Sequence, residues 1–329
     1  MNSMEEYLVI GSGGMARRYI SLLRSIIDNA NVSCLPTSIN SSIRTYTGID
    51  RIYETIDEAL HADPKAVIVA SPAPTHLEYA SIFLKKNIPT LIEKPISVHK
   101  DDILEYDINS DNSLGLAEVA YCLRYLPSAE KFKEIIDNQT YVGKILNVIA
   151  EVGQYLPDWR PNIDYRDSVS ANKEMGGGVL LELSHEIDYL NWLFGPIEKV
   201  ACQLSNSGSL EISVEDSVDA IFTSSNLKIN LHMDFLQRTP TRFCKVIGKE
   251  GNLIWDILAD SITFSKENVI KVVYEGEKNA KDYMYKEMIK NFLRQDSMPG
   301  VTIAESLRVL DIVEKMRLSS ETGNNLVIN

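Results

Sequence analysis

Two side chains in this sequence could move a proton during a reaction: the ammonium group of Lys94 and the imidazole of His185. A lysine at the end of a strand can hydrogen-bond a substrate hydroxyl and help to move its proton, although a single lysine is more often a surface residue. His185 lies in a helix predicted over Val179–Leu193, and an imidazole titrates near neutral pH. Glu182 and Asp188 lie three residues before and after it. A carboxylate on the same helix face could therefore fix the imidazole tautomer.

His185 also has two other interpretations. It could satisfy a buried acid as part of the packing, or it could bind a metal. No metal is expected, because the pattern is not HExxH and no cysteine lies nearby. Three preceding glycines, at 176–178, would let a ligand approach the backbone. With Lys94 also present, acid–base chemistry is the favoured interpretation.

A glycine-rich turn between a predicted strand and a predicted helix could bind a dinucleotide. Its sequence is GSGGMA: Gly11 permits a tight turn, and Gly13 lets the backbone approach a pyrophosphate. Ala16 is small enough for close packing of the helix on the strand, and the first N–H groups of that helix would face the phosphates. An ordinary structural turn is less favoured, because the required strand and helix flank the motif. The residues expected to contact the dinucleotide are Gly11, Gly13, Gly14, Met15 and Ala16.

The end of the second predicted strand bears on the choice between NAD and NADP. Sites specific for NAD usually place an acidic residue there to bind the ribose 2′-hydroxyl. Here the stretch reads Leu-Pro-Thr-Ser, with hydroxyls at Thr37 and Ser38 and with Arg44 further on. Hydroxyls and a guanidinium suit a 2′-phosphate. We therefore expect NAD or NADP to bind, with NADP preferred.

Two further segments follow predicted strands. In an open α/β sheet, ligands bind beyond the carboxyl ends of the strands. The loop after Ala66–Ala70 should therefore line the dinucleotide, although His76 could equally pack at the start of the next helix. The residues placed at this edge are Ser71, Pro72, Thr75, His76, Glu93 and Lys94.

A long loop after about residue 153 carries aromatic and basic side chains. Aromatic rings stack on sugars, and an arginine fork matches a phosphate. The equally weighted alternative is a loop that Trp159 folds over a sheet. The candidates for substrate contact are Arg124, Tyr155, Trp159 and Arg166.

The elements that must position these residues fall into two patterns. Strands and helices alternate through residues 1–125, as in the helix predicted over Met15–Ile27, and the apolar run AVIVA suits a parallel sheet covered on both faces. Residues 126–329 contain longer alternating strands, most clearly Leu227–Phe235. We therefore predict a Rossmann domain over 1–125 and an α+β substrate-binding and oligomerisation domain, with an open, mostly antiparallel sheet, over 126–329.

Several motifs occur in the order of a known family. These are GSGGMA, VIVASPAPTHLEYA, IEKP, and GGG followed by His-x-x-Asp. Together they resemble the glucose–fructose oxidoreductase, inositol dehydrogenase and MocA (Gfo/Idh/MocA) family, and in part its members from bacterial surface-glycan gene clusters. The resemblance implies nicotinamide-dependent chemistry on a sugar or nucleotide-sugar carbinol. It also implies that Lys94 lies by the nicotinamide, with a cis bond to Pro95, and that His185 is the acid–base residue.

The sequence departs from the family pattern near His185. The family places an aspartate four residues before its histidine, where this chain has Leu181. Alignment on the glycines would match Glu182 to that aspartate and Glu186 to the histidine. Alignment on Asp188 matches His185 instead, and we prefer it because a histidine titrates near neutrality.

Composition narrows the class of protein and of partner. The 329 residues carry a net charge of −13, which disfavours nucleic acid and anionic membranes as partners. The four cysteines are far apart, and few residues precede the first strand, so we expect a cytoplasmic protein without disulfides. The open sheet face predicts a homodimer or homotetramer. A non-catalytic dinucleotide sensor of the same fold is the alternative to an enzyme, and within enzymes, chemistry with a tightly held, recycled cofactor is a further option.

Overall fold

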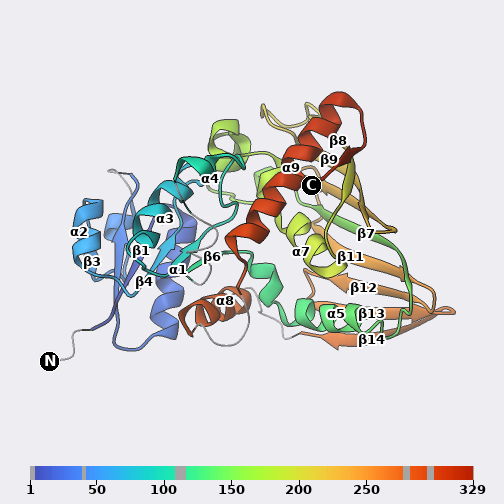
Figure 1. Cartoon of the computed structure of the whole chain (residues 1–329), viewed down its shortest axis with the longest axis horizontal. Coiled ribbons are helices and arrows are strands. Elements are labelled where there is room, and N and C mark those ends of the chain that lie inside the picture. The colour runs from blue at the N-terminus through green and yellow to red at the C-terminus, as the bar shows by residue number, and fades with distance from the viewer. Residues whose placement is uncertain are drawn as a thin grey trace. The chain divides into compact units, whose positions relative to one another are not determined.

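The computed structural model describes residues 4–38, 42–106, 108, 116–276, 282–294 and 300–328. By contacts the chain divides into two compact units (Figure 1). In the described part of the chain, no helix has the length and apolar character needed to cross a bilayer. The first unit consists of Met1–Tyr121 and Tyr285–Leu307, and the second of Cys122–Met284 and Arg308–Asn329.

The first unit contains the predicted parallel sheet. Its strand order is β3-β2-β1-β4-β5-β6, and every neighbouring pair is parallel. β4 is buried along its whole length, as its unbroken run of apolar residues predicts. α1 packs on β1 and β2, and α3 packs on β4 and β5. The elements are β1 (Glu6–Ile10), α1 (Gly14–Ile26), β2 (Asn31–Leu35), β3 (Arg51–Ile52), α2 (Ile56–His61), β4 (Ala66–Val69), α3 (His76–Leu84), β5 (Thr90–Ile92), α4 (Asp102–Glu105) and β6 (Ala117–Val119).

A segment from late in the chain completes the first unit. In α8 (Tyr283–Arg294), the ring of Tyr285 lies edge-on to that of Tyr19, with centroids 6.3 Å apart. The backbone N–H of Val119 donates to the carbonyl of Val301 over 2.8 Å. The division into 1–125 and 126–329 expected from the sequence places this segment in the second domain. Contacts between residues so far apart in the chain leave no local sequence pattern, so no sign of them could be read from the sequence.

The second unit contains a sheet with the strand order β14-β13-β12-β11-β7-β10-β9-β8-β15. Its neighbouring strands are antiparallel except for β7 and β10, which are parallel. The sheet is therefore mostly antiparallel, as predicted. The elements are α5 (Pro127–Asp137), β7 (Ile145–Gly153), α6 (Val179–Glu182), α7 (His185–Phe194), β8 (Lys199–Ser205), β9 (Ser217–Ser224), β10 (Leu227–Asp234), β11 (Thr241–Gly248), β12 (Asn252–Asp256), β13 (Ser261–Lys266), β14 (Val269–Glu275), α9 (Ile303–Thr322) and β15 (Leu326–Val327).

One face of this sheet is covered by helices and the other is half-open. On the covered face, Trp255 of β12 is fully buried between Phe132 of α5 and Tyr189 of α7, with ring centroids 5.4 and 5.3 Å away. The alternation predicted for β10 is confirmed: Leu231 is buried, whereas His232 is half-buried on the opposite face. Helix packing on one face therefore accounts for the in-and-out pattern of the strands.

Candidate active site

The glycine-rich turn lies at the carboxyl end of β1 and leads directly into α1. Gly11 has φ +150°, and a Cβ added there would lie 2.4 Å from the carbonyl oxygen of Ala70. The backbones can approach so closely only because this residue has no side chain. Among the described atoms, none lies within 4 Å of a Cβ added at Gly13 or Gly14, so the space at the N-terminus of α1 is open to a pyrophosphate. The next residues are Met15, half-buried, and Ala16, buried.

The loop after β4 is tied to the loop after β5 by a buried histidine. The Nδ1 atom of His76 lies 2.8 Å from the carbonyl oxygen of Pro95, and Nε2 lies 2.7 Å from that of Ser71. Burial lowers the pKa of His76, and the two carbonyls oppose that effect. The hydroxyl of Thr75 donates to Ser71 Oγ and to the carbonyl of Pro72, both over 2.9 Å. The geometry favours local packing for His76.

Lys94 directly follows β5 and Glu93, and its bond to Pro95 is cis, as the family resemblance implied. Glu93 is 8 % exposed. One of its carboxylate oxygens accepts from the Tyr19 hydroxyl over 2.6 Å, and the other accepts from the backbone N–H of Lys94 over 2.9 Å. Burial raises the pKa of Glu93, and the hydrogen bond from Tyr19 opposes this. Through Glu93, α1 is therefore linked to the backbone of Lys94.

The end of β2 presents hydroxyls. Ser12 Oγ accepts from the hydroxyl of Thr37 over 3.3 Å and from the backbone N–H of Ser38 over 3.0 Å. The Arg44 guanidinium donates to both carboxylate oxygens of Glu54, over 2.6 and 3.0 Å. Thr37 and Ser38 therefore lie beside the glycine-rich turn, whereas Arg44 lies in an ion pair with Glu54.

His185 begins a helix and does not lie within one. The single helix predicted over Val179–Leu193 is wrong, because α6 ends at Glu182 and α7 begins at His185. Leu183, between them, has φ −101° and ψ 24°, outside the helical range. Glu182 and His185 therefore do not lie on one face of a continuous helix. Both are half-buried.

Two buried ion pairs hold the first turn of α7. Asp188, 1 % exposed, accepts two hydrogen bonds from the Arg124 guanidinium, over 2.6 and 3.0 Å. Glu186, fully buried, accepts two from Arg242, over 2.7 and 2.9 Å. The sequence suggested Asp188 as a partner of His185 and Arg124 as a substrate contact, and the structure pairs Asp188 with Arg124.

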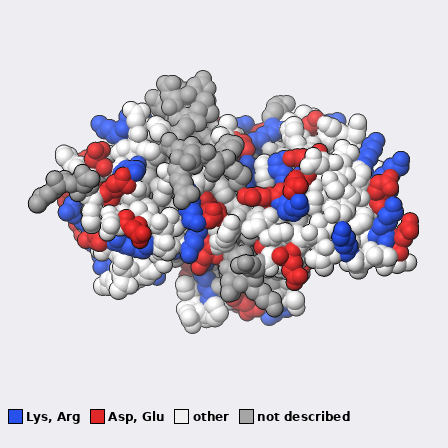
Figure 2. Space-filling view, turned by 90° about the horizontal axis from the view of Figure 1, so that it is seen from below, with Lys and Arg blue, Asp and Glu red and all other residues white. Residues whose placement is uncertain are grey.

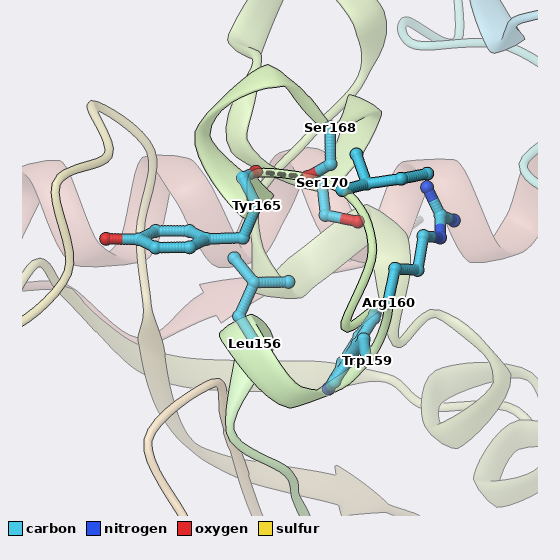
Figure 3. A pocket seen from close by; sticks show the side chains of 7 residues that line it. Leu156, Trp159, Arg160, Tyr165, Ser168 and Ser170 are labelled. Carbon is cyan, nitrogen blue, oxygen red and sulfur yellow. Dashed lines mark hydrogen bonds between the residues drawn. The ribbon is translucent and has the colours of Figure 1, made fainter.

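The loop after β7 folds around a small hollow (Figure 3). Trp159 lies edge-on to Phe235, with ring centroids 5.2 Å apart, and its Nε1 donates to the carbonyl of Gln154 over 3.3 Å. Figure 3 shows the ring of Tyr165 next to Leu156, with its hydroxyl pointing away from the hollow. These contacts support the interpretation in which Trp159 folds the loop over the sheet.

The other two candidates for substrate contact have different surroundings. The exposed Arg166 donates to Asp164 over 2.5 to 3.0 Å and to Glu211 over 2.6 Å, and it lowers the pKa of Asp164 to about 2. The ring of Tyr155 is half-buried beneath the guanidinium of Arg238, whose central carbon lies 3.5 Å from the ring centroid. The guanidinium of Arg166 is thus shared by two carboxylates.

Sequence reasoning missed Tyr19 beside Lys94 in the first unit, and Arg242 and Arg238 in the second unit, and it set Glu186 aside in favour of His185. Tyr19 reads as one more apolar position of α1, and Arg242 lies 56 residues from Glu186. An acid beside the apolar positions Ile187 and Leu190 of α7 was the available signal for the ion pair, because a charge buried there needs a partner.

Two family profiles match the chain. Residues 6–106 match an oxidoreductase family with an NAD-binding Rossmann fold, and residues 129–254 match the GFO/IDH/MocA C-terminal domain. Among relatives, Oxidoreductase P35 of Formosa agariphila is 25% identical, over 76% of this chain and 77% of that protein. Glucose-6-phosphate 3-dehydrogenase of Bacillus subtilis is 29% identical, over 58% of this chain and 54% of that enzyme.

Solved structures share the fold across the whole chain. Levoglucosan dehydrogenase in complex with NADH and levoglucosan superposes with a TM-score of 0.81 at 17% identity, over 99% of this chain and 100% of that one. The WlbA dehydrogenase from Bordetella pertussis, in complex with NADH and UDP-GlcNAcA, gives 0.80 at 19% identity, over 99% of each chain. With both family profiles matched in order, the chain belongs to the Gfo/Idh/MocA family of oxidoreductases and carries its NAD-binding Rossmann domain.

Proposed function

We propose that this protein transfers a hydride between a nicotinamide dinucleotide and a carbinol carbon of a sugar or nucleotide sugar. The observation that carries the proposal is the shared edge of the parallel sheet. The open turn around Gly13 follows β1, and Lys94 follows β5. Because the carboxyl ends of parallel strands meet at one edge, a dinucleotide held by the turn can extend towards Lys94.

Different residues of this chain have different roles in the proposed reaction. The backbone N–H groups of Gly13, Gly14 and Met15 would hold the pyrophosphate, in the space left open at the N-terminus of α1. When bound, the dinucleotide supplies the site that accepts or donates the hydride. Lys94 hydrogen-bonds the oxygen of the substrate carbinol, and His185 takes its proton during oxidation and returns it during reduction.

A sugar or sugar-derived substrate is proposed from the family. One relative is named a glucose-6-phosphate 3-dehydrogenase, and one structural neighbour holds UDP-GlcNAcA. The surface-glycan resemblance favours a nucleotide sugar over a free sugar. We also propose that a second copy of the chain covers the half-open sheet face around His232, which light scattering would test as a dimer or tetramer mass.

NADP is the proposed cofactor of preference. The end of β2 presents the hydroxyls of Thr37 and Ser38 with no carboxylate in that stretch, and Arg17 of α1 donates to Ser42 nearby in the chain. Tight binding of NADPH with at least tenfold weaker binding of NADH would support this preference. The reverse order would contradict it while leaving hydride transfer intact.

The direct test is a turnover screen. Purified protein is mixed with NAD⁺ or NADP⁺ and a panel of free sugars, sugar phosphates and nucleotide sugars, and the absorbance of the reduced nicotinamide is followed. We expect at least one sugar-class substrate to be oxidised. Dinucleotide binding without turnover of any substrate in either direction would instead support a non-catalytic sensor.

A further inference from the structure

At one end of the second unit's sheet, a guanidinium lies flat on an aromatic ring. Arg238 follows β10, Tyr155 follows β7, and the guanidinium carbon lies 3.5 Å from the ring centroid. The two loops are held together, because Leu156 donates its backbone N–H to the carbonyl of Phe235 over 3.0 Å. Stacking fixes the plane of the guanidinium and leaves its N–H edge pointing outward.

Within the part of the chain that the structure describes, Arg238 has no anionic partner, unlike two other arginines of the second unit. Arg166 pairs with Asp164, and Arg242 pairs with Glu186. Among the residues that the structure describes, no carboxylate oxygen lies within 4.0 Å of a nitrogen of Arg238. The residue is also exposed. An oriented guanidinium without a partner is able to bind an oxyanion through two parallel hydrogen bonds.

Arg238 is connected, through a nearby arginine of the same unit, to the residues around His185. Arg242 lies four residues further along the chain, and four residues span at most about 14 Å. The Arg242 guanidinium in turn binds Glu186, the neighbour of His185. Arg238 and the arginine that binds the neighbour of His185 therefore lie on one short segment of the chain, with their Cα atoms at most about 14 Å apart.

Because the chain as a whole is acidic, a local positive group matters for the binding of an anion. The net charge of −13 repels an anionic substrate at long range. Figure 2 shows acidic and basic side chains interspersed on the face that it presents, so the local sign of charge is set residue by residue. A positioned guanidinium is the local feature that an anionic substrate requires.

We propose that Arg238, held flat on Tyr155, binds an oxyanion of the substrate, either a phosphate or a carboxylate attached to the sugar. This rests on the proposed function in one respect only, the assignment of a sugar-class substrate. It makes Arg238 a specificity-determining residue that separates anionic sugars from neutral ones.

The experiment measures binding and does not require turnover. Protein saturated with dinucleotide is titrated by calorimetry with UDP, glucose 6-phosphate, glucuronate and glucose at one fixed ionic strength. The four probes distinguish pyrophosphate, phosphate monoester, carboxylate and a neutral sugar. Arg238→Gln should weaken the tightest anionic probe about 10- to 100-fold, the range for a charged hydrogen bond. Dinucleotide affinity and the unfolding midpoint should stay unchanged, because the side chain is exposed.

Matched variants separate stacking from general charge. Tyr155→Phe keeps the ring and should bind like wild type, whereas Tyr155→Leu removes the platform and should weaken the same probe severalfold. Arg51→Gln is the control, because Arg51 also lies over a tyrosine, 5.9 Å from the Tyr53 ring, on β3 of the first unit.

Three results would overturn the proposal: anionic binding within twofold of wild type in Arg238→Gln, an equal loss in Arg51→Gln, or no binding of any anionic probe by wild type. Anion binding that depends on Arg238 in a protein that oxidises no sugar would refute the proposed function and leave this site standing.

Discussion

The glycine-rich turn of the first unit and the first turn of α7 in the second unit both prepare a site, but by different means. In the turn, the groups that matter are backbone N–H groups, and glycines leave the space around them open. In α7, the acids beside His185 are bound by arginines 64 and 56 residues away in the chain. A few adjacent residues can therefore specify a dinucleotide site, whereas the proposed acid–base site depends on partners that only the fold brings together.

The largest expected effect comes from the two proposed proton-handling side chains, one in each unit. Lys94→Ala or His185→Ala should lower kcat by about 10²- to 10⁴-fold, because each removes a general acid–base group. Dinucleotide affinity should stay within a few-fold of wild type, since the turn is untouched. Steady-state kinetics on the substrate found by the screen, with calorimetry for the dinucleotide, would measure both.

Lys86→Ala serves as the control for Lys94, because Lys86 is an exposed lysine of the same unit. Full activity in either proposed catalytic variant would break the assignment of that residue.

The next effect tests whether the α7 region depends on its remote partners. Arg242→Met leaves the fully buried Glu186 without its guanidinium, and losing one partner of a buried ion pair costs about 3–5 kcal/mol of unfolding free energy. Urea unfolding of the variant should show this loss. The double variant Glu186→Leu with Arg242→Met should recover most of it, and an equally unstable double variant would argue against the ion pair as the cause.

A pair of glycine variants tests whether the turn depends on its own residues and not on remote partners. Gly11→Ala should destabilise the protein by about 1–3 kcal/mol, because φ +150° and the nearby Ala70 carbonyl oppose a side chain. Gly13 has φ −91° and open space around it, so the unfolding free energy of Gly13→Ala should be unchanged. The dinucleotide affinity of this variant should fall about tenfold or more. Thermal unfolding and calorimetry separate the two. Equal behaviour of the two variants would remove the distinction between structural and binding glycines.

The smallest effect concerns a charge cluster that belongs to neither region. Hydrogen bonds with Asp234 and then Asp219 raise the pKa of His232 to about 9. Its stabilising contribution is present in full below the ordinary pKa of about 6.5, and it is lost as the pH rises through 9. Because the side chain is 38% exposed, we expect about 1 kcal/mol or less. Denaturant midpoints at pH 6 and pH 10 should differ less in His232→Asn than in wild type, and an identical difference would exclude His232 as the source.

The parallel sheet could be predicted because its signals are local. The buried run Ala66–Val69 and the glycine that ends β1 lie within a few residues of the structure they specify. The split between α6 and α7 could not be predicted, because the apolar period continues through Leu183 while its backbone leaves the helical range. The pairing of Arg124 with Asp188 was equally hidden, since either residue alone also suits a ligand contact.

The path of the chain through the first unit limits how the protein can be divided experimentally. Tyr285 packs on Tyr19, and Val301 accepts a hydrogen bond from Val119, so a fragment that ends near Tyr121 lacks part of its own fold. Such a fragment would expose the surface of α1 that carries Tyr19, the residue bonded to Glu93. A self-sufficient dinucleotide-binding module would have to be spliced from both stretches, with a short linker replacing the intervening sheet unit.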